Sequence, residues 1–560
     1  MTPSAAPTRP PRQVIRGGRV LDVFTGDLLA LDVVVEDGRI AALMPRGDGA
    51  TADAVIDADG GVLVPGYVEP HCHLNLVAEP VVTLEQLAAR GTTSVVADTY
   101  PWMALLSVEE FSRLLDAFRA MPVSVRWFLA PHSRSFWPDE ERLFAPGRLA
   151  PVLGRDDVVA VGEFTRWSMV ERGDPVLLDY IARARALGKR VEGHSAGASA
   201  ARVMRLAQRG FTSCHEAIDA AQVMDRLRAG LYVMLRHSSL RPDLPQLAAA
   251  VRGELANSNR IMLTADGPSP VWIAANGYMD HLVRVAMDAG LPPAAAYRMA
   301  TLNPAMYYRM EDDVGSIAPG RRADVLLLED LSDPTPLWVM SGGRIVAREG
   351  RLTAPFPRIP WAGFPGMSVP VGRPPSEELL LGLPGPGAGQ VPLLDLAHTV
   401  IIRQGAREER PILAALYDWH GRWITPAWLT GFAPDLAGFA TSYNPSGQLA
   451  ILGHSPADIA LAARRVMELG GGFAMAEGGR IIWEMRLERA GFFTERPWAD
   501  LVADLGELER VLRERGYRHG EPLYSVFFLS FDSLPDFRLT IRGVWDVKGQ
   551  RPLSPPVPIV

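Results

Sequence analysis

Two histidines separated by one residue are the first feature of the chain that could do chemistry. His71 and His73 follow the apolar run LVPGYVE. Side chains two positions apart on a strand point the same way, so both imidazoles can reach one metal ion. Only 11 of the 560 residues are histidines, and several of the others also follow apolar runs. The sequence therefore favours a metal site over two ordinary surface histidines.

Further candidate ligands end other apolar runs. Glu163 ends VVAVGEF, His194 follows RVEG, His215 follows FTSC and Asp266 ends RIMLTAD. Imidazole and carboxylate groups suit Mn, Fe or Zn alike. Two such ions repel each other unless they share an anion, so we expect Glu163 to bridge them. Asp266 is the expected general base, although an aspartate before glycine is also a common turn residue.

Polar residues at or just after the strand ends are the candidates for contacts with a substrate. They are Arg236, His237, Ser238, Trp102, His132 and Arg166. His237 is also expected to take part in catalysis, together with Asp266 and Glu163. Each candidate has an ordinary alternative as a packing, capping or surface residue.

The elements that must position these residues have the rhythm of an α/β barrel. Between residues 66 and 304, short β-branched runs alternate with helical stretches such as EEFSRLLDAFRAM, which predicts parallel strands joined by helices. Eight strand candidates can be named: LVPGYVE, TTSVVAD, VSVRWFLA, VVAVGEF, RVEGH, FTSCH, YVMLRH and RIMLTAD. Eight strands close a TIM-like (β/α)8 barrel, whose active site lies at the carboxyl ends of the strands. The candidate ligands should therefore converge at one mouth.

The segments outside the barrel indicate further units. Residues 12–65 and 305–352 carry short apolar runs between Gly-containing turns, so both flanks of the barrel are expected to build one small β-sandwich-like domain. Residues 353–392 are dense in Pro and Gly and predict an extended linker. Residues 393–560 mix strand-like and helical runs, which predicts a C-terminal α+β domain.

Composition narrows the class of protein. The chain is 48% hydrophobic and 22% charged, which is typical of globular proteins. Its net charge of −7 provides no general basic field for nucleic acid or an anionic membrane, so we expect a small-molecule substrate. Two cysteines in 560 residues favour a cytoplasmic protein without disulfides. The first dozen residues show no signal peptide, and no apolar run is long enough to span a bilayer.

The strand-end pattern resembles a known family. PGYVEPHCH, the single Glu163 and the residues His194, His215 and Asp266 are similar to the amidohydrolase superfamily, and more closely to the bacterial adenine deaminase family. YVMLRHSSLRPDL, GSIAPGRRADVLLL and MELGGGFAMAEGGRI also resemble that family, so the similarity covers nearly the whole chain. It implies two divalent metal ions, Mn, Fe or Zn, that activate water for attack on C6 of a purine with release of ammonia, in a homo-oligomer. The metal ligands it implies are His71, His73, Glu163, His194, His215 and Asp266.

Several positions depart from the pattern of that family. His237 stands where the family has an acidic residue, and Gly267 and Ser269 stand where it has an aspartate and a histidine. Tyr278 stands where it has a histidine, and SYNPSGQ replaces a segment rich in His, Asp and Ser. Such changes leave the expected ligands intact but alter the groups that would bind substrate, which predicts a different or broadened substrate.

Three functions are compatible with these observations. The first is deamination of adenine or an adenine-like purine. The second is hydrolysis of an amide, lactam or other nitrogen heterocycle by the same machinery. The third is a non-catalytic barrel-fold binding protein, against which the complete set of six ligands argues.

Overall fold

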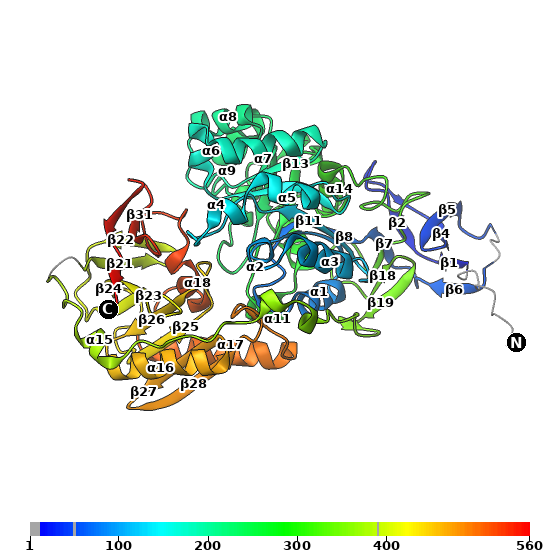
Figure 1. The fold of residues 1–560 in the computed structure, drawn as a ribbon. Helices are drawn as coiled ribbons and strands as arrows, with labels where there is room; N and C mark the ends of the chain where they lie inside the picture. The colour runs from blue at the N-terminus through cyan, green and yellow to red at the C-terminus, as the bar shows by residue number, and fades with distance from the viewer. Residues whose placement is uncertain (1–11, 49–51, 389–390, 560) are drawn as a thin grey trace, which may run out of the picture.

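A parallel barrel of eight strands forms the centre of the molecule in the computed structural model (Figure 1), which describes residues 12–48, 52–388 and 391–559. Its strands, in the order of their pairing, are β8 (Tyr67–Cys72), β10 (Thr92–Asp98), β11 (Ser124–Leu129), β12 (Val158–Phe164), β13 (Arg190–Gly193), β14 (Ser213–Cys214), β15 (Tyr232–Arg236) and β16 (Ile261–Thr264). An isolated parallel bridge between Cys72 and Asp266 joins the first and last strands, so the barrel is nearly closed. Seven of the eight predicted runs contain a barrel strand, while the first, LVPGYVE, overlaps only the start of β8. The predicted fold class is confirmed.

Helices connect successive strands and cover the barrel. The main ones are α1 (Pro80–Ala89), α3 (Val108–Phe118), α5 (Pro146–Leu153), α7 (Pro175–Ala186), α8 (Ala200–Arg209), α9 (Ala220–Arg228), α12 (Met279–Asp288) and α14 (Leu302–Tyr308). Helix α3 shows why they form. Ser107 and Glu110 make a reciprocal capping box at its start, and Phe111, Leu114 and Phe118 form its buried face.

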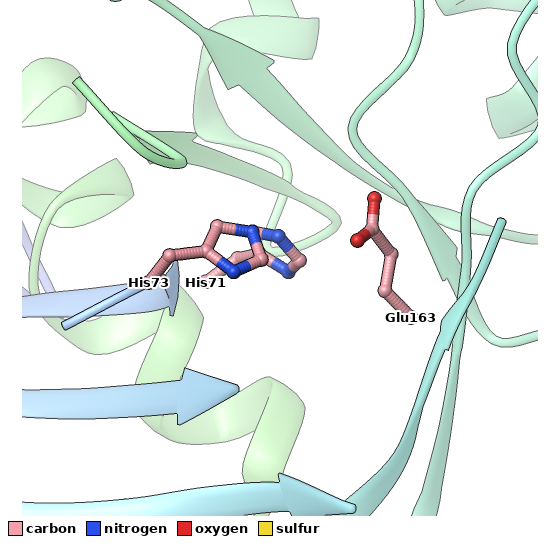
Figure 2. Close-up of side chains that lie close together, drawn as sticks. All are labelled: His71, His73 and Glu163. Carbon is pink, nitrogen blue, oxygen red and sulfur yellow. The ribbon is translucent and has the colours of Figure 1, made fainter. Parts of the chain in front are cut away.

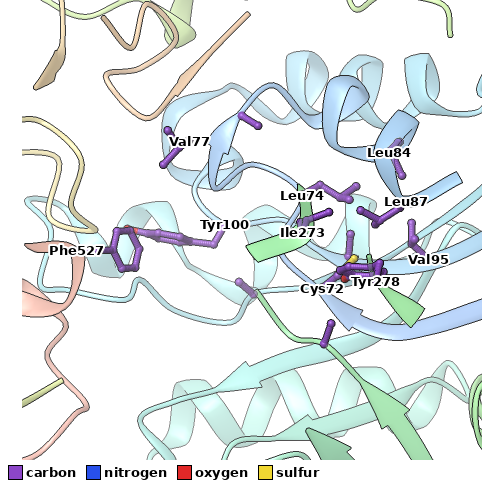
Figure 3. Close-up of a cluster of buried hydrophobic side chains, with 14 of the residues drawn as sticks. Cys72, Leu74, Val77, Leu84, Leu87, Val95, Tyr100, Ile273, Tyr278 and Phe527 are labelled. Carbon is purple, nitrogen blue, oxygen red and sulfur yellow. The ribbon is translucent and has the colours of Figure 1, made fainter. Parts of the chain in front are cut away.

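The strand–helix layer of the barrel is packed with apolar side chains (Figure 3). Cys72 and Val95 on neighbouring strands belong to the same buried cluster as Leu84 and Leu87 of α1. Each of these leucines is 1% exposed, and burial of such a side chain contributes roughly 1.5–3 kcal/mol. The rigid layer fixes the strand ends, and thereby the side chains that follow them.

Both flanks of the barrel contribute to one seven-stranded sheet, as expected. Its strands, in spatial order, are β20 (Arg351–Leu352), β19 (Arg344–Arg348), β18 (Trp338–Ser341), β17 (Val325–Leu328), β7 (Val62–Pro65), β2 (Arg19–Leu21) and β3 (Leu28–Leu29). The junction pairs β7 with β17 in antiparallel register, with Val62 opposite Leu328. A second sheet contains β5 (Arg39–Pro45), β4 (Leu31–Glu36), β1 (Gln13–Arg16) and β6 (Ala54–Asp57). The exact domain boundaries stay a prediction.

The C-terminal part is a second large α+β unit. Its main sheet consists of β22 (Ile401–Gln404), β21 (Leu393–His398), β24 (Trp423–Thr430), β23 (Ile412–Tyr417), β26 (Leu449–Gly453), β25 (Gly438–Thr441), β27 (Gly472–Glu477) and β28 (Arg480–Arg486), with β33 (Val557–Pro558) beside β24. Helix α16 (Pro456–Leu469) packs on β25 and β27. Two further helices, α17 (Trp498–Glu514) and α18 (Pro522–Phe527), lead to a 3-10 turn, η4 (Phe528–Ser530).

The predicted linker contains a short helix that the sequence reasoning did not expect. Helix α15 (Glu377–Leu381) forms inside residues 353–392 because SEELLL is free of Pro and Gly and Ser376 caps its start. Strand β29 (Phe493–Thr494) pairs with β9 (Val77–Ala78) and ties the C-terminal part to the barrel. No helix in the described ranges is long and apolar enough to cross a bilayer. The first eleven residues, where no signal peptide is expected, lie outside those ranges.

Candidate active site

The first two histidines meet an aspartate from the opposite end of the barrel sequence. His71 lies at the end of β8, His73 lies directly after that strand, and Asp266 lies just after β16. Asp266 Oδ1 is 3.4 Å from His71 Nε2 and 3.1 Å from His73 Nε2. Asp266 has a φ of 62°, a left-handed conformation that is rare outside glycine and is often found at functional sites. The closure of the barrel therefore brings these three side chains together.

A second group of ligands lies next to the first. Glu163 Oε1 contacts His194 Nδ1 and lies 3.1 Å from His215 Nε2. The two imidazoles are themselves 3.2 Å apart, measured from His194 Nδ1 to His215 Nε2. The carboxylate of Glu163 faces His71 and His73 across the mouth (Figure 2). Glu163 thus stands between the two pairs of histidines, where the bridging hypothesis requires it.

The atoms of these groups have the arrangement and chemistry of a divalent-metal site. Ligand atoms of His71, His73 and Glu163 lie within 4.8 Å of one another, and so do those of Glu163, His194 and His215. Two buried imidazole nitrogens, His71 Nε2 and His215 Nδ1, have no hydrogen-bond partner among the described residues. Buried polar atoms are normally paired, and imidazole with carboxylate is a donor set that Zn, Fe and Mn accept. The residues present therefore fit a metal centre.

Two buried glutamates that the sequence analysis missed hold the ligands in place. Glu192 Oε1 is 2.6 Å from His71 Nδ1, so it orients that imidazole. Glu69 accepts hydrogen bonds from the backbone N–H groups of His71 and Ala265 and from the hydroxyl of Thr264. Burial raises the pKa of Glu69 to about 7 despite these donors. Both glutamates lie two residues before a ligand histidine on a strand, and that spacing was the available signal.

An arginine and an aspartate connect the two ligand groups. Asp98 Oδ2 lies 3.3 Å from His73 Nδ1 and 2.8 Å from Arg134 Nη2. The same Arg134 nitrogen is 3.4 Å from Glu163 Oε2. Arg134 follows β11 in the sequence but is not at the strand end, so position alone did not point to it. The arginine offsets the negative charge where two buried carboxylates come together.

Arg236 contacts the candidate general base directly. Its Nη1 is 2.6 Å from Asp266 Oδ2 and 2.5 Å from Glu216 Oε1. Burial raises the pKa of Glu216, but Arg236, His194 and Arg241 together hold it down at about 2. Arg236 was predicted to contact substrate, whereas Glu216, in the segment TSCHEA, was not predicted. The structure therefore makes Arg236 a partner of Asp266.

The electrostatic field of the cluster favours a cation. Burial alone would lower the pKa of His73, yet the hydrogen bonds and charges of Asp266 and Asp98 raise it to about 9. Protons and a divalent ion compete for the same imidazole nitrogens. A field that attracts a proton to His73 attracts a metal cation to the same place.

A cavity opens above the cluster and has two unlike walls. The barrel wall carries the charged lining residues His73, Asp98, Arg134, Glu163, His194, Glu216, Arg236, Arg241 and Asp266, beside a few apolar ones such as Leu76 and Leu240. The facing wall comes from the C-terminal part and includes Val400, Phe492, Tyr524, Phe527, Phe528, Phe531 and Leu534. The catalytic cluster is therefore enclosed by two distant parts of the chain.

Trp102 is not among the cavity-lining residues. It is 0% exposed and its ring stacks on Phe118 and meets Trp127 edge to face, with centroids 5.9 and 5.4 Å away. Its large ring packs in the apolar core of the barrel wall. The structure does not bring it to the site as a substrate contact.

His132 and Arg166 are placed at the joint between the barrel and the C-terminal part. Arg166 contacts Asp532 and Glu140, with Nε 3.1 Å from Asp532 Oδ1 and Nη1 2.5 Å from Glu140 Oε1. His132 lies 2.6 Å from the carbonyl of Ser133 through Nδ1 and faces the backbone N–H of Arg166 through Nε2. Neither residue lines the cavity. The guanidinium of Arg166 is used in ion pairs with Glu140 and Asp532, which the sequence alone does not reveal.

His237 and Ser238 also lie outside the cavity lining. The ring of His237 is 6.2 Å from Trp272 and 5.5 Å from His281, measured between centroids. The backbone N–H of Ser238 donates to the carbonyl of Arg241. A role for His237 in catalysis stays a prediction.

Gly267 and Ser269, two positions that depart from the pattern of the family, contact the C-terminal part. The hydroxyl of Tyr524 donates to the carbonyl oxygen of Gly267, and the hydroxyl of Ser269 donates to Glu521. These two contacts join the segment after Asp266 to the C-terminal part.

Comparisons with known proteins agree with this arrangement. Residues 62–346 match the model of the amidohydrolase family, and residues 397–551 match the adenine deaminase C-terminal domain. The chain is 32% identical to a provisionally named adenine deaminase from Halalkalibacterium halodurans, over 98% of this chain and 95% of that one. It is 29% identical to an adenine deaminase from Moorella thermoacetica, over 96% and 94% of the two chains. Among solved structures, a dihydropyrimidinase from Brevibacillus agri is 15% identical with a TM-score of 0.47, over 61% and 96% of the two chains.

Proposed function

The chain belongs to the amidohydrolase family, and from this premise we propose that it hydrolyses adenine or an adenine-like purine to the 6-oxo product and ammonia. The chain is a metal-dependent hydrolase. The adenine-specific part of the proposal is supported by relatives that are named adenine deaminases and that align over nearly the full length, including the C-terminal domain. One observation carries the hydrolytic part of the proposal: the six candidate ligands, which include the candidate base Asp266, come together from five strand ends at the barrel mouth.

We assign the ligands to two divalent ions, Mn, Fe or Zn. His71 and His73, whose side chains lie within 3.4 Å of Asp266, would hold one ion together with that aspartate. His194 and His215 would hold the other, with Glu163 as the shared ligand. Such ions supply Lewis-acid activation of a water molecule at neutral pH. Glu192 and Asp98 fix the orientation of the imidazoles of His71 and His73 through their Nδ1 atoms, as ligand histidines would require.

Asp266 moves the proton in this proposal. Asp266 lines the cavity; its Oδ1 faces the two histidines, and its Oδ2 is paired with Arg236. Oδ2 takes one proton from water as the oxygen–C6 bond forms, and it delivers that proton to the exocyclic nitrogen as the C6–nitrogen bond breaks. Ammonia leaves, and the second water proton remains on the 6-oxo product. Burial raises the pKa of Asp266, but His71, His73 and Arg236 together hold it well below its usual range.

The apolar wall excludes water from this chemistry. Phe527, Phe528 and Phe531 face the polar floor across the cavity, and a dry site strengthens each electrostatic interaction inside it. We also propose that the protein acts in the cytoplasm as a homo-oligomer, with a small-molecule substrate and without nucleic-acid or membrane partners. Light scattering of the purified protein checks the oligomeric state.

The test of the proposed function is turnover with defined metals. Protein reconstituted separately with Mn, Fe or Zn is incubated with adenine, and ammonia release and purine absorbance are followed together. We expect one ammonia for each hypoxanthine formed, and loss of both signals in Asp266→Asn. Metal-loaded protein that leaves adenine unchanged would refute deamination of adenine and direct the assay to amides and lactams.

A further inference from the structure

The two pairs of ligand histidines differ in how their rings are supported. His71 and His73 each have a carboxylate beside Nδ1. His194 and His215 each face Glu163 with one ring nitrogen, and the opposite nitrogen of neither ring has a hydrogen-bond partner in the part of the chain that the structure describes. Ligand histidines are normally held by such an outer contact. The second pair therefore needs support of another kind.

A buried arginine joins the two segments that carry the second pair. Arg226 lies in α9 and is 0% exposed. Its Nη2 is 3.0 Å from the carbonyl oxygen of Ser195, which directly follows His194. Its Nε is 3.2 Å from Sγ of Cys214, which directly precedes His215. Because the guanidinium is planar and rigid, it fixes the ends of β13 and β14 relative to each other.

Further contacts hold this link in place. The hydroxyl of Ser195 lies 3.0 Å from Cys214 Sγ and 3.4 Å from Arg226 Nη2. The backbone N–H of Glu216 donates to the same sulfur at 3.3 Å. Nη1 of Arg226 donates to the carbonyl oxygen of Gln222, one turn earlier in α9, at 3.1 Å. Every nitrogen of the guanidinium thus has a partner, and the helix sets the position of the whole group.

The charge of Arg226 does not explain its place beside a metal centre. None of its hydrogen-bond partners is a carboxylate; they are two carbonyl oxygens, a hydroxyl and a sulfur. A buried positive charge near the ligands repels a divalent cation. On charge alone the arginine would weaken the site, so its contribution must come from its geometry.

We propose that Arg226 is a positioning residue for the metal centre, and that it holds the segments after β13 and β14 so that His194 and His215 reach the same ion. This inference rests on the proposed function, because it takes the two histidines as ligands of one ion. Removal of the side chain frees two acceptors from their common donor, and the two imidazoles then lose their fixed relative arrangement. The ion that they hold should bind less tightly, while the ion at the first pair of histidines should not.

The test measures the affinity of the full-length protein for Zn²⁺. Wild type, Arg226→Met, Arg226→Lys and His215→Ala are stripped of metal and titrated with zinc against a competing chelator, and bound zinc is counted by elemental analysis. His215→Ala identifies the ion that depends on the second pair. Arg148→Met is the matched control, because Arg148 is a half-buried arginine that donates to three backbone carbonyl oxygens in the barrel wall, none of them next to a ligand.

The expected result is a selective loss. Arg226→Met should weaken the ion that His215→Ala loses by about 10- to 100-fold and leave the other ion at wild-type affinity. The direction is decisive, since removal of a buried positive charge would by itself strengthen the binding of a cation. Arg226→Lys keeps the charge but not the planar fork, so it should weaken the same ion by a smaller factor, and it carries the test if Arg226→Met does not fold. Arg148→Met should bind zinc as wild type does.

Two results refute the positioning role. One is zinc binding as tight as in wild type, or tighter, in either Arg226 variant, even where thermal unfolding shows a less stable protein. The other is an equal weakening of both ions in Arg226→Met, which indicates a general loss of structure.

Other outcomes concern the proposed function. Wild type that binds a single ion, which His215→Ala loses, refutes the assignment of two ions, while the Arg226 variants still decide the positioning role. Wild-type zinc binding in His215→Ala refutes both, because His215 is then no ligand. Deamination does not enter the zinc titration and is decided by ammonia release alone.

Discussion

Removal of the Arg166 side chain should loosen the C-terminal wall of the cavity far more than an ordinary ion pair would. Arg166 is 11% exposed and contacts Asp532, which is 1% exposed, and Glu140, which is 14% exposed. Arg166→Met removes the arginine that is paired with the buried Asp532 and leaves only the weaker influence of Arg542, and loss of one partner of a buried pair typically costs about 3–5 kcal/mol. The cost should appear as local opening of residues 522–534, which carry the aromatic wall.

Hydrogen exchange followed by mass spectrometry measures that opening. An opening free energy lower by about 3–5 kcal/mol corresponds to exchange faster by roughly two to three and a half orders of magnitude in residues 522–534. Arg183→Met is the matched control, because Arg183 and Asp179 form an exposed pair with side chains 43% and 42% exposed, and such pairs contribute about 0–1 kcal/mol. The control should leave residues 522–534 unchanged.

The loss of protection that Arg166→Met causes in residues 522–534 should also depend on pH in a defined direction. Burial raises the pKa of Asp532 to about 6, although Arg166 acts to lower it. A carboxyl group whose folded pKa is raised favours the folded state at low pH, and this contribution is lost as pH rises through the folded pKa. Protection of residues 522–534 in Arg166→Met should therefore fall from pH 5 to pH 8, and Arg166→Met/Asp532→Asn should recover much of it. Two results would contradict the reasoning. One is that Arg166→Met is as protected from exchange as Arg183→Met. The other is that the double variant loses as much protection as Arg166→Met and Asp532→Asn lose together.

Three further results are expected. Glu163→Gln should weaken metal affinity about 10-fold or more, as measured by elemental analysis after dialysis, and an unchanged metal content would rule out the bridging role. Trp102→Ala should lower stability by about 3–5 kcal/mol in thermal unfolding while KM of the folded enzyme stays the same; a raised KM would restore Trp102 as a substrate contact. Burial and the nearby His281 lower the pKa of His237 to about 4, so the stabilisation from its neutral form is present above its unfolded pKa of about 6.5 and is lost as pH falls toward 4. His237→Gln should remove this part of the acid destabilisation in melting curves recorded between pH 7 and 4, and a large loss of kcat at neutral pH would instead establish the predicted catalytic role.

The sequence by itself determined the barrel and its six candidate ligands. Strand and helix alternation is a local pattern, and parallel strands joined by helices must place all their carboxyl ends at one mouth. His71 and His73 also share a face through local strand geometry, so their meeting with Glu163 and Asp266 could be predicted without knowing any long-range contact. The flanking sheet was similarly visible in its short apolar runs, although the pairing of β7 with β17 gave it its register.

Only the tertiary structure decided which polar residues support the ligands and which face the substrate. Arg166 and Asp532 are 366 residues apart, and no local pattern reveals that one is the partner of the other. The same is true of Tyr524, whose hydroxyl meets the carbonyl of Gly267 across 257 residues. Strand position predicts that a side chain lies near the mouth, but the direction of that side chain depends on what packs against it. The aromatic wall of the cavity therefore emerges only when the C-terminal part is docked on the barrel.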